Sequence, residues 1–189
     1  MTAELMRPAA AEFLRVALAV DDLTAPTPCD GYAVRGLLNH LLYWGPWLAA
    51  AGRREEAPSP GAGEADAALV TAGWVAALEK QTETLVEVFG TPTAWTGMTK
   101  LGTAELPAAV VGGMVLGEFV LHGWDLARAS GQELSCTPSV AAAVLESAVA
   151  MGEQARAMGV YGPEVPVPAD AAPLDRALGA AGRDPSWTP

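Results

Sequence analysis

The chain contains few residues of the kinds that carry chemistry or cross-links. Among its 189 residues are two cysteines and two histidines, and only 17% of the residues are charged. Two cysteines, Cys29 and Cys136, are too few for a disulfide framework. Because 51% of the residues are hydrophobic, the chain can instead bury an apolar core, which excludes a disordered protein. The length suits one domain with a substantial core.

Basic residues are also scarce. Lys and Arg together number 11 against 22 Asp and Glu, so the net charge is -11. Such a surface repels phosphate backbones, and we expect no nucleic-acid partner. We find no uninterrupted apolar run of the roughly 18 residues that a membrane span needs, and the charged first twenty residues do not resemble a signal peptide. We therefore expect a cytoplasmic protein with small-molecule partners and no membrane partner, either a monomer or a homodimer.

Apolar residues recur at spacings of three and four along most of the chain, which is the period of an α-helix. This pattern predicts helices over residues 8–20, 32–51, 64–89, 106–129 and 138–158, with a further short helix over 173–178. Residues 90–102 are interrupted by Pro and Gly, and only 95–98 has strand character. The sequence therefore predicts an all-α bundle over residues 1–160. The Pro- and Ala-rich tail, residues 161–189, is expected to pack on the bundle or extend from it.

Both histidines fall in helix-patterned segments. His122 follows Glu118 by four residues in the segment GEFVLHGWD, so the two side chains share one face of a helix about one turn apart. His40 lies on the apolar stripe of a different predicted helix. If these helices pack face to face, they offer two imidazoles and one carboxylate to a divalent metal ion. Such a site leaves at least one coordination position open for chemistry.

The surroundings of Glu118 favour this metal site over ordinary structural roles. Taken singly, each histidine is more often an uncharged core or edge residue, and a glutamate is more often solvated. No other charge occurs between Pro107 and His122, however, and burying an isolated carboxylate there would be costly. A cation shared with two imidazoles would satisfy all three groups. Asp125 follows on the same stripe and is a candidate catalytic residue, either orienting the His122 ring or contacting substrate.

Three further side chains are candidates for binding a substrate or cofactor. Trp44 and Trp47 share the stripe of His40 and could wall a pocket, although Trp at this spacing more often belongs to the core. Arg128 could receive a substrate carboxylate or form a structural ion pair. Cys29 is predicted to lie about 14–16 Å along the helix from His40, which makes it a poor candidate for a ligand. We expect it to be a small buried residue at the start of that helix.

Two segments resemble a known family. Residues 27–40, TPCDGYAVRGLLNH, are similar to the start of the second helix in the DinB-like superfamily, and more narrowly in the metal-binding N-terminal domain of mycothiol-dependent maleylpyruvate isomerases. Residues 122–132, HGWDLARASGQ, resemble the second motif of that group. The tail segments YGPEVPV, at 161–167, and GRDP, at 182–185, extend the similarity over nearly the whole chain.

The resemblance implies an up-down-down-up four-helix bundle that binds a divalent metal, commonly zinc or nickel, through two histidines and one glutamate. His40, Glu118 and His122 occupy those positions. The isomerase carries an additional C-terminal domain where this chain has a short tail. Relatives of the shorter kind with assigned activities tend to be thiol S-transferases that use mycothiol or bacillithiol.

Together these features predict a metal-dependent thiol S-transferase-like enzyme. The metal, zinc in the first place, would activate a low-molecular-weight thiol such as mycothiol for attack on an electrophilic small molecule. The residues leave two alternatives open. One is a metal-dependent isomerase or hydrolase at the same site, and the other is a non-catalytic protein that binds the metal or a ligand.

Overall fold

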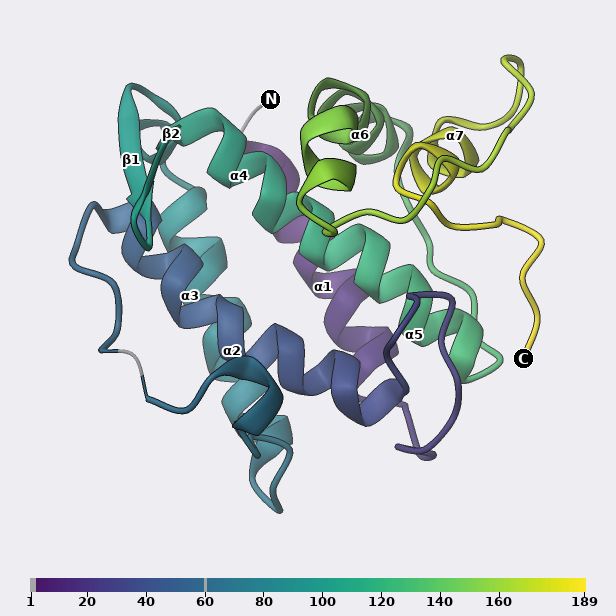
Figure 1. Ribbon diagram of the computed structural model, residues 1–189, viewed down its shortest axis with the longest axis horizontal. Helices are drawn as coiled ribbons and strands as arrows, with labels where there is room; N and C mark the ends of the chain where they lie inside the picture. The colour runs from purple at the N-terminus through teal and green to yellow at the C-terminus, as the bar shows by residue number, and fades with distance from the viewer. Residues whose placement is uncertain (1–2, 60) are drawn as a thin grey trace.

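The computed structural model describes residues 3–59 and 61–189 and is built almost entirely of helices (Figure 1). The α-helices are α1 (Met6–Ala17), α2 (Val34–Arg53), α3 (Trp74–Phe89), α4 (Ala108–Gly117), α5 (Gly123–Ala129), α6 (Pro138–Ala157) and α7 (Pro173–Ala180). Short turns of 3-10 helix are η1 (Ala3–Leu5), η2 (Glu64–Asp66) and η3 (Pro92–Trp95), and η4 (Glu118–His122) is a π-helical turn. The predicted all-α fold class is confirmed.

The helices surround one apolar core. α2 packs on α3 and α4, α1 packs on α3 and α5, and α6 lies between α4 and α7 (Figure 1). Phe13 of α1 and Phe119 of η4 meet in the middle, with ring centroids 5.4 Å apart. Both rings are almost fully buried, as are Leu37 and Leu78. Each such side chain contributes about 1.5–3 kcal/mol to folding by leaving water.

One helical run, residues 108–129, forms the centre of this core. It comprises α4, η4 and α5 and is long and apolar enough to cross a membrane by length and composition alone, although charged residues interrupt its apolar sequence. Within its most apolar window, 67% of the residues are buried inside the protein. A core helix with this burial passes the same test, so the run carries no argument for a membrane.

The helix predicted over 64–89 begins ten residues later, at Trp74. Apart from the short turn η2, the segment between residues 64 and 73 is held by hydrogen bonds to α2. The Asn39 amide donates to the carbonyl of Glu64 at 3.1 Å and accepts from the backbone N–H of Leu69 at 2.9 Å. The Arg35 guanidinium donates to the carbonyl of Val70 at 3.0 Å. These bonds satisfy the backbone from a neighbouring helix, a tertiary effect that local periodicity does not reveal.

The predicted loop over 90–102 contains more regular structure than expected. Strands β1 (Met98–Leu101) and β2 (Ala104–Pro107) form an antiparallel hairpin, so the extended segment expected at 95–98 and the helix start expected at 106 are both wrong. Gly102 has a φ of +62°, a left-handed conformation that lets the chain reverse between the strands. The Thr99 hydroxyl donates to the carbonyl of Ala51, which fastens the hairpin to the end of α2.

Gly112 allows η3 to approach α4 closely. A Cβ atom at this position would lie 2.5 Å from the Trp95 ring, whose indole N–H donates to the carbonyl of Phe89. We predict that Gly112→Ala lowers the free energy of unfolding by about 1–3 kcal/mol, because the anchored ring cannot move aside.

Gly117→Ala is the matched control on the same helix. The nearest atom to its added Cβ would be Leu121 Cδ1 at 3.9 Å, an ordinary contact. Its free energy of unfolding should be unchanged or increased, since alanine favours a helix over glycine by about 1 kcal/mol. Urea unfolding of both variants measures the difference, and equal stabilities would contradict the packing role of Gly112.

Candidate metal centre

Three donor side chains from two elements converge at the centre of the bundle. Oε2 of Glu118 lies 3.6 Å from Nε2 of His40 and 3.7 Å from Nε2 of His122. The donor atoms of all three residues lie within 4.8 Å of one another. α2 contributes His40, whereas η4 contributes Glu118 and His122. The two predicted helix faces are thus brought together.

The spacing and chemistry of these donors fit a divalent ion. Oε2 of Glu118 is buried and has no hydrogen-bond partner among the described residues, an expensive state for a carboxylate oxygen. Ligand atoms placed about 2.1 Å from one ion at tetrahedral angles stand about 3.4 Å apart, close to the observed separations. The side chains of His40, Glu118 and His122 are 19%, 21% and 12% exposed, and three protein ligands would leave a coordination position for a further ligand.

Glu118 and His122 sit on a π-helical turn, not on the regular α-helix that the sequence predicted. A π-helix has a wider turn than an α-helix, and short π-helical turns inserted in α-helices occur frequently at functional sites. Both ends of this turn carry a glycine, Gly117 and Gly123. The wider turn still brings residues four apart to one face, so the prediction of a shared face was correct although the helix type was not.

Each histidine ring is hydrogen-bonded through Nδ1 to a carboxylate, on the side of the ring away from Glu118. Nδ1 of His40 lies 3.0 Å from Oε1 of Glu64, and Nδ1 of His122 lies 3.0 Å from Oδ2 of Asp125. An ionised carboxylate only accepts hydrogen bonds, so Nδ1 carries the proton in both rings. Nε2 of each ring is thereby directed toward Glu118. Metal-binding histidines are commonly held in this way.

Asp125 is itself paired with an arginine from the tail. The Arg183 guanidinium donates to both carboxylate oxygens, at 2.9 Å to Oδ2 and 3.3 Å to Oδ1. Asp125 has no exposed surface and Arg183 is 5% exposed. The sequence placed Asp125 on the correct face for catalysis or ring orientation, and its complete burial suits orientation of His122. The GRDP segment that contains Arg183 thus reaches the site from 58 residues away.

The charges in this cluster stabilise one another. Burial alone would raise the pKa of the Glu118 carboxyl, but the imidazoles of His122 and His40 outweigh burial and hold that pKa below its usual range. Burial alone would lower the pKa of His122, but the carboxylates of Glu118 and Asp125 outweigh burial and raise that pKa to about 10. An incoming divalent ion would therefore displace a proton from His122.

Cys29 lies closer to the site than the sequence indicated. Its sulfur is within 4.8 Å of donor atoms on His122 and Asp125, because the loop before α2 runs beside α5 (Figure 1). The distance of about 14–16 Å expected from the sequence applies along α2 from Cys29 to His40 and does not include His122 and Asp125, which lie on a different helical run. Arg183 donates to Cys29 Sγ at 3.5 Å as well as to Asp125. A cation at this second group of donors would compete with the guanidinium, so the group containing Glu118 is the better metal site.

The remaining candidates take different positions. Trp44 adjoins the site, since its indole N–H donates to Oε2 of Glu64 at 2.7 Å. Trp47 lies beside Trp44, with ring centroids 5.9 Å apart, and extends toward the hairpin, where it faces Gly102. Both rings are partly buried. Arg128 donates from Nε to the carbonyl of Trp187 at 3.0 Å, so it holds the tail and its donors do not point to the metal donors.

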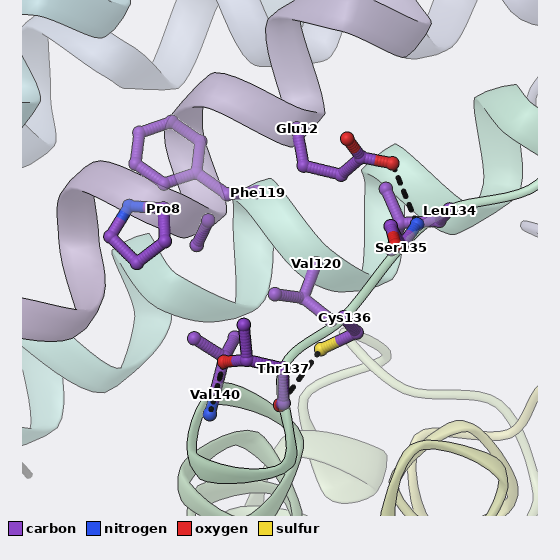
Figure 2. A pocket seen from close by; sticks show the side chains of 10 residues that line it. Pro8, Glu12, Phe119, Val120, Leu134, Ser135, Cys136, Thr137 and Val140 are labelled. Atoms are coloured by element: carbon purple, nitrogen blue, oxygen red, sulfur yellow. Dashed lines mark hydrogen bonds between the residues drawn. The ribbon is translucent and has the colours of Figure 1, made fainter.

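A small cleft lies on a different side of the core and does not overlap the three donors. Figure 2 shows its lining from α1, η4 and the segment before α6, with Glu12 at its edge. The Glu12 carboxylate is already engaged by Arg15 and by the backbone N–H of Ser135. Cys136 Sγ contacts the carbonyl of Thr137. With its one charged lining group already paired, this cleft is a poor binding site.

Two residues of the site were missed at the level of sequence. Glu64 was assigned to a long helix, and no local signal relates it to His40. In the sequence, Arg183 is distinguished only as part of the GRDP segment, which resembles the corresponding segment of the family. A signal for Arg183 did exist, because Asp125 lies in an apolar helical run where a carboxylate requires a cationic partner.

The pairing of Asp125 with Arg183 can be tested by stability. We predict that Arg183→Met lowers the free energy of unfolding by about 3–5 kcal/mol, since it leaves a fully buried carboxylate without its partner. Arg176→Met removes the same charge from an exposed position on α7 and should change it by less than about 0.5 kcal/mol. Urea unfolding of both variants measures this, and an equally small effect would contradict the buried pair.

Known proteins resemble this chain in sequence. The uncharacterized proteins Rv0738 and MT0763, from two strains of Mycobacterium tuberculosis, are each 29% identical to it over 165 residues. The matched region is 86% of this chain and 86% of each relative.

Solved structures share its fold. Crystal structures of the mycothiol-dependent maleylpyruvate isomerase and of one of its mutants superpose with TM-scores of 0.61 and 0.62 at 16% identity. The superposition covers 98% of this chain and 80% of each of those chains. At this identity the likeness establishes the fold alone.

The family model of the mycothiol maleylpyruvate isomerase N-terminal domain matches residues 6–127, a span that contains His40, Glu118 and His122. This match confirms the resemblance seen in the sequence, and the chain belongs to that family.

Proposed function

We propose that the chain is a divalent-metal-dependent enzyme that activates a low-molecular-weight thiol of the mycothiol type for attack on an electrophilic small molecule. The observation that carries the proposal is Oε2 of Glu118, which is buried, has no hydrogen-bond partner in the described part of the chain, and lies 3.6 and 3.7 Å from Nε2 of the two histidines. Two imidazoles and a carboxylate are a donor set typical of catalytic zinc sites, so zinc is the first metal to test and nickel the second.

The protein groups have separate tasks in this proposal. A divalent ion held by His40, Glu118 and His122 would supply a Lewis acid that lowers the pKa of a thiol at its open position. Glu118 contributes negative charge that offsets the charge of the ion. Asp125 accepts a hydrogen bond from Nδ1–H of His122 and so fixes the ring, while Arg183 neutralises the charge of Asp125.

Thiol chemistry suits the site better than hydrolysis does. A metal-dependent hydrolase commonly uses a general base near the attacking water, although a zinc-bound water can also ionise near neutral pH. Asp125 is completely buried and bound by Arg183, and the oxygens of Glu64 are occupied by three donors. Asp125 is out of reach of water, and protonation of Glu64 would compete with the hydrogen bonds that it accepts from three donors. A thiol is a much stronger acid than water, so a bound cation ionises a thiol more readily than it ionises a water molecule and with less help from a base.

The family supports the choice of thiol. The matching domain is named for mycothiol and for maleylpyruvate isomerase, and both solved structures are of a mycothiol-dependent enzyme. In a transfer reaction the thiol releases its proton to solvent and its sulfur forms a C–S bond at the electrophilic carbon. A leaving group, where one exists, departs with the electron pair. If the electrophile is a conjugated double bond, rotation followed by loss of the thiol would give isomerisation instead.

Metal binding distinguishes the two groups of donors described above. We predict that His40→Ala and Glu118→Gln each lower the affinity for Zn²⁺ by more than about 100-fold, because removing a ligand costs more than removing its outer partner. Cys29→Ala should bind Zn²⁺ as the unaltered protein does. Competition with a chromophoric chelator measures all three affinities. If Cys29→Ala loses Zn²⁺ binding and His40→Ala retains it, the metal binds at the group of Cys29, His122 and Asp125 instead.

Activity is tested with chelator-treated protein and with the same protein reloaded with Zn²⁺ or Ni²⁺. We predict that only reloaded protein conjugates mycothiol to members of a panel containing an activated halide, an epoxide and an α,β-unsaturated acid. Mass spectrometry identifies the conjugate, and Glu118→Gln is the inactive control. If reloaded protein hydrolyses esters and consumes no thiol with any electrophile, the transferase proposal is wrong.

A further inference from the structure

Glu64 is the meeting point of three hydrogen-bond donors around the metal centre. Its Oε1 accepts from the Tyr32 hydroxyl at 2.7 Å and from Nδ1 of His40 at 3.0 Å. Its Oε2 accepts from the indole N–H of Trp44 at 2.7 Å. The Glu64 side chain is 24% exposed, so the carboxylate is shielded but not enclosed. Tyr32 precedes α2, while His40 and Trp44 occupy successive turns of it.

The backbone around Glu64 is also held in place. The Asn39 amide bonds to the carbonyl of Glu64 and to the N–H of Leu69, and Arg35 bonds to the carbonyl of Val70. η2 therefore lies against α2, as Figure 1 shows. Because residues 64, 69 and 70 are all hydrogen-bonded to α2, the Glu64 carboxylate has a fixed position relative to His40.

We propose that Glu64 is a positioning residue that keeps Nε2 of His40 turned toward Glu118, so that the loop between α2 and α3 forms part of the metal centre. This inference rests on the proposed metal-dependent function. Without Glu64, the remaining polar neighbour of Nδ1 is the Tyr32 hydroxyl at 3.4 Å, a longer contact whose own acceptor is then lost, and a half-turn about the Cβ–Cγ bond would exchange the two edges of the ring. His122 already has such an acceptor in Asp125, and Glu64 gives His40 the equivalent support from a different part of the chain.

The arrangement requires a carboxylate. Three donors point at two oxygens, and an ionised carboxylate accepts all of them. A glutamine has one oxygen and one NH₂ group, so at least one of the three donors would face another donor. An alanine would leave all three donors without this acceptor. The effects of Glu64→Ala should therefore exceed those of Glu64→Gln.

Metal affinity provides the first measurement. Outer partners of metal-bound histidines typically change affinity by about 10–100-fold. We expect Glu64→Ala to lower the affinity for Zn²⁺ within that range and Glu64→Gln to lower it less. Asp66→Ala is the matched control, since Asp66 lies on the same short turn and is exposed. It removes the same charge and should leave the affinity unchanged.

The second measurement needs neither metal nor activity. The chain has two histidines, so ¹⁵N-histidine labelling reports only the two rings of interest. In metal-free protein, each hydrogen-bonded Nδ1–H should give a downfield proton signal protected from exchange with water. Glu64→Ala should lose the His40 signal and keep the His122 signal, whereas Asp66→Ala should keep both. The retained His122 signal verifies that the bundle is folded.

The two measurements separate this inference from the proposed function. If Glu64→Ala keeps both signals and the affinity of the unaltered protein, Glu64 does not position His40. The inference is also wrong if Asp66→Ala reproduces both effects, because loop charge alone would then be responsible. If the unaltered protein binds no divalent metal but Glu64→Ala loses the His40 signal, the proposed function fails while the positioning of the ring stands.

Discussion

The structure around the site depends on one constraint, which is the burial of a carboxylate oxygen in an apolar helix. Oε2 of Glu118 is inaccessible to water and makes no hydrogen bond with the described residues. Such an oxygen is stable only if positive charge lies close to it. His122, whose pKa is raised to about 10, supplies that charge, and a divalent ion between the three groups would supply more of it at shorter range. The geometry of the centre follows from this requirement.

Charges of alternating sign extend outward from Glu118. Toward the tail, the His122 ring is followed by Asp125 and then by Arg183, each within hydrogen-bonding distance of the next. Toward the loop, the His40 ring is followed by Glu64. Each group has a hydrogen-bonding or charged neighbour, so removing Arg183 would leave the buried Asp125 without its cation. The loop before α3 and the tail after α6 are thereby tied to the core of the bundle.

The sequence predicts the centre of this arrangement better than its surroundings. Glu118 and His122 are four residues apart on one helix, and His40 is the one other histidine, so local periodicity and composition suffice to pair them. Glu64 is different, because its partners lie 20 to 32 residues away and its own segment shows a helical pattern that tertiary hydrogen bonds override. Arg183 is 58 residues from Asp125. The position of Cys29 was misjudged for the same reason, since distance along one helix says nothing about a second helix folded beside it.

Family membership and site geometry constrain the chemistry in different ways. The shared fold positions α2 against the central helical run, but a fold of this kind can host several reactions. The choice between thiol and water depends on proton transfer, because a metal-bound thiol ionises more readily than a metal-bound water and depends less on a nearby base. The two carboxylates nearest the histidines have their oxygens occupied, one by a buried arginine and the other by three neutral or cationic donors. Asp125 and Glu64 are thus engaged in holding the His122 and His40 rings. The site therefore favours a nucleophile that ionises readily on binding to the metal, and a thiol has that property.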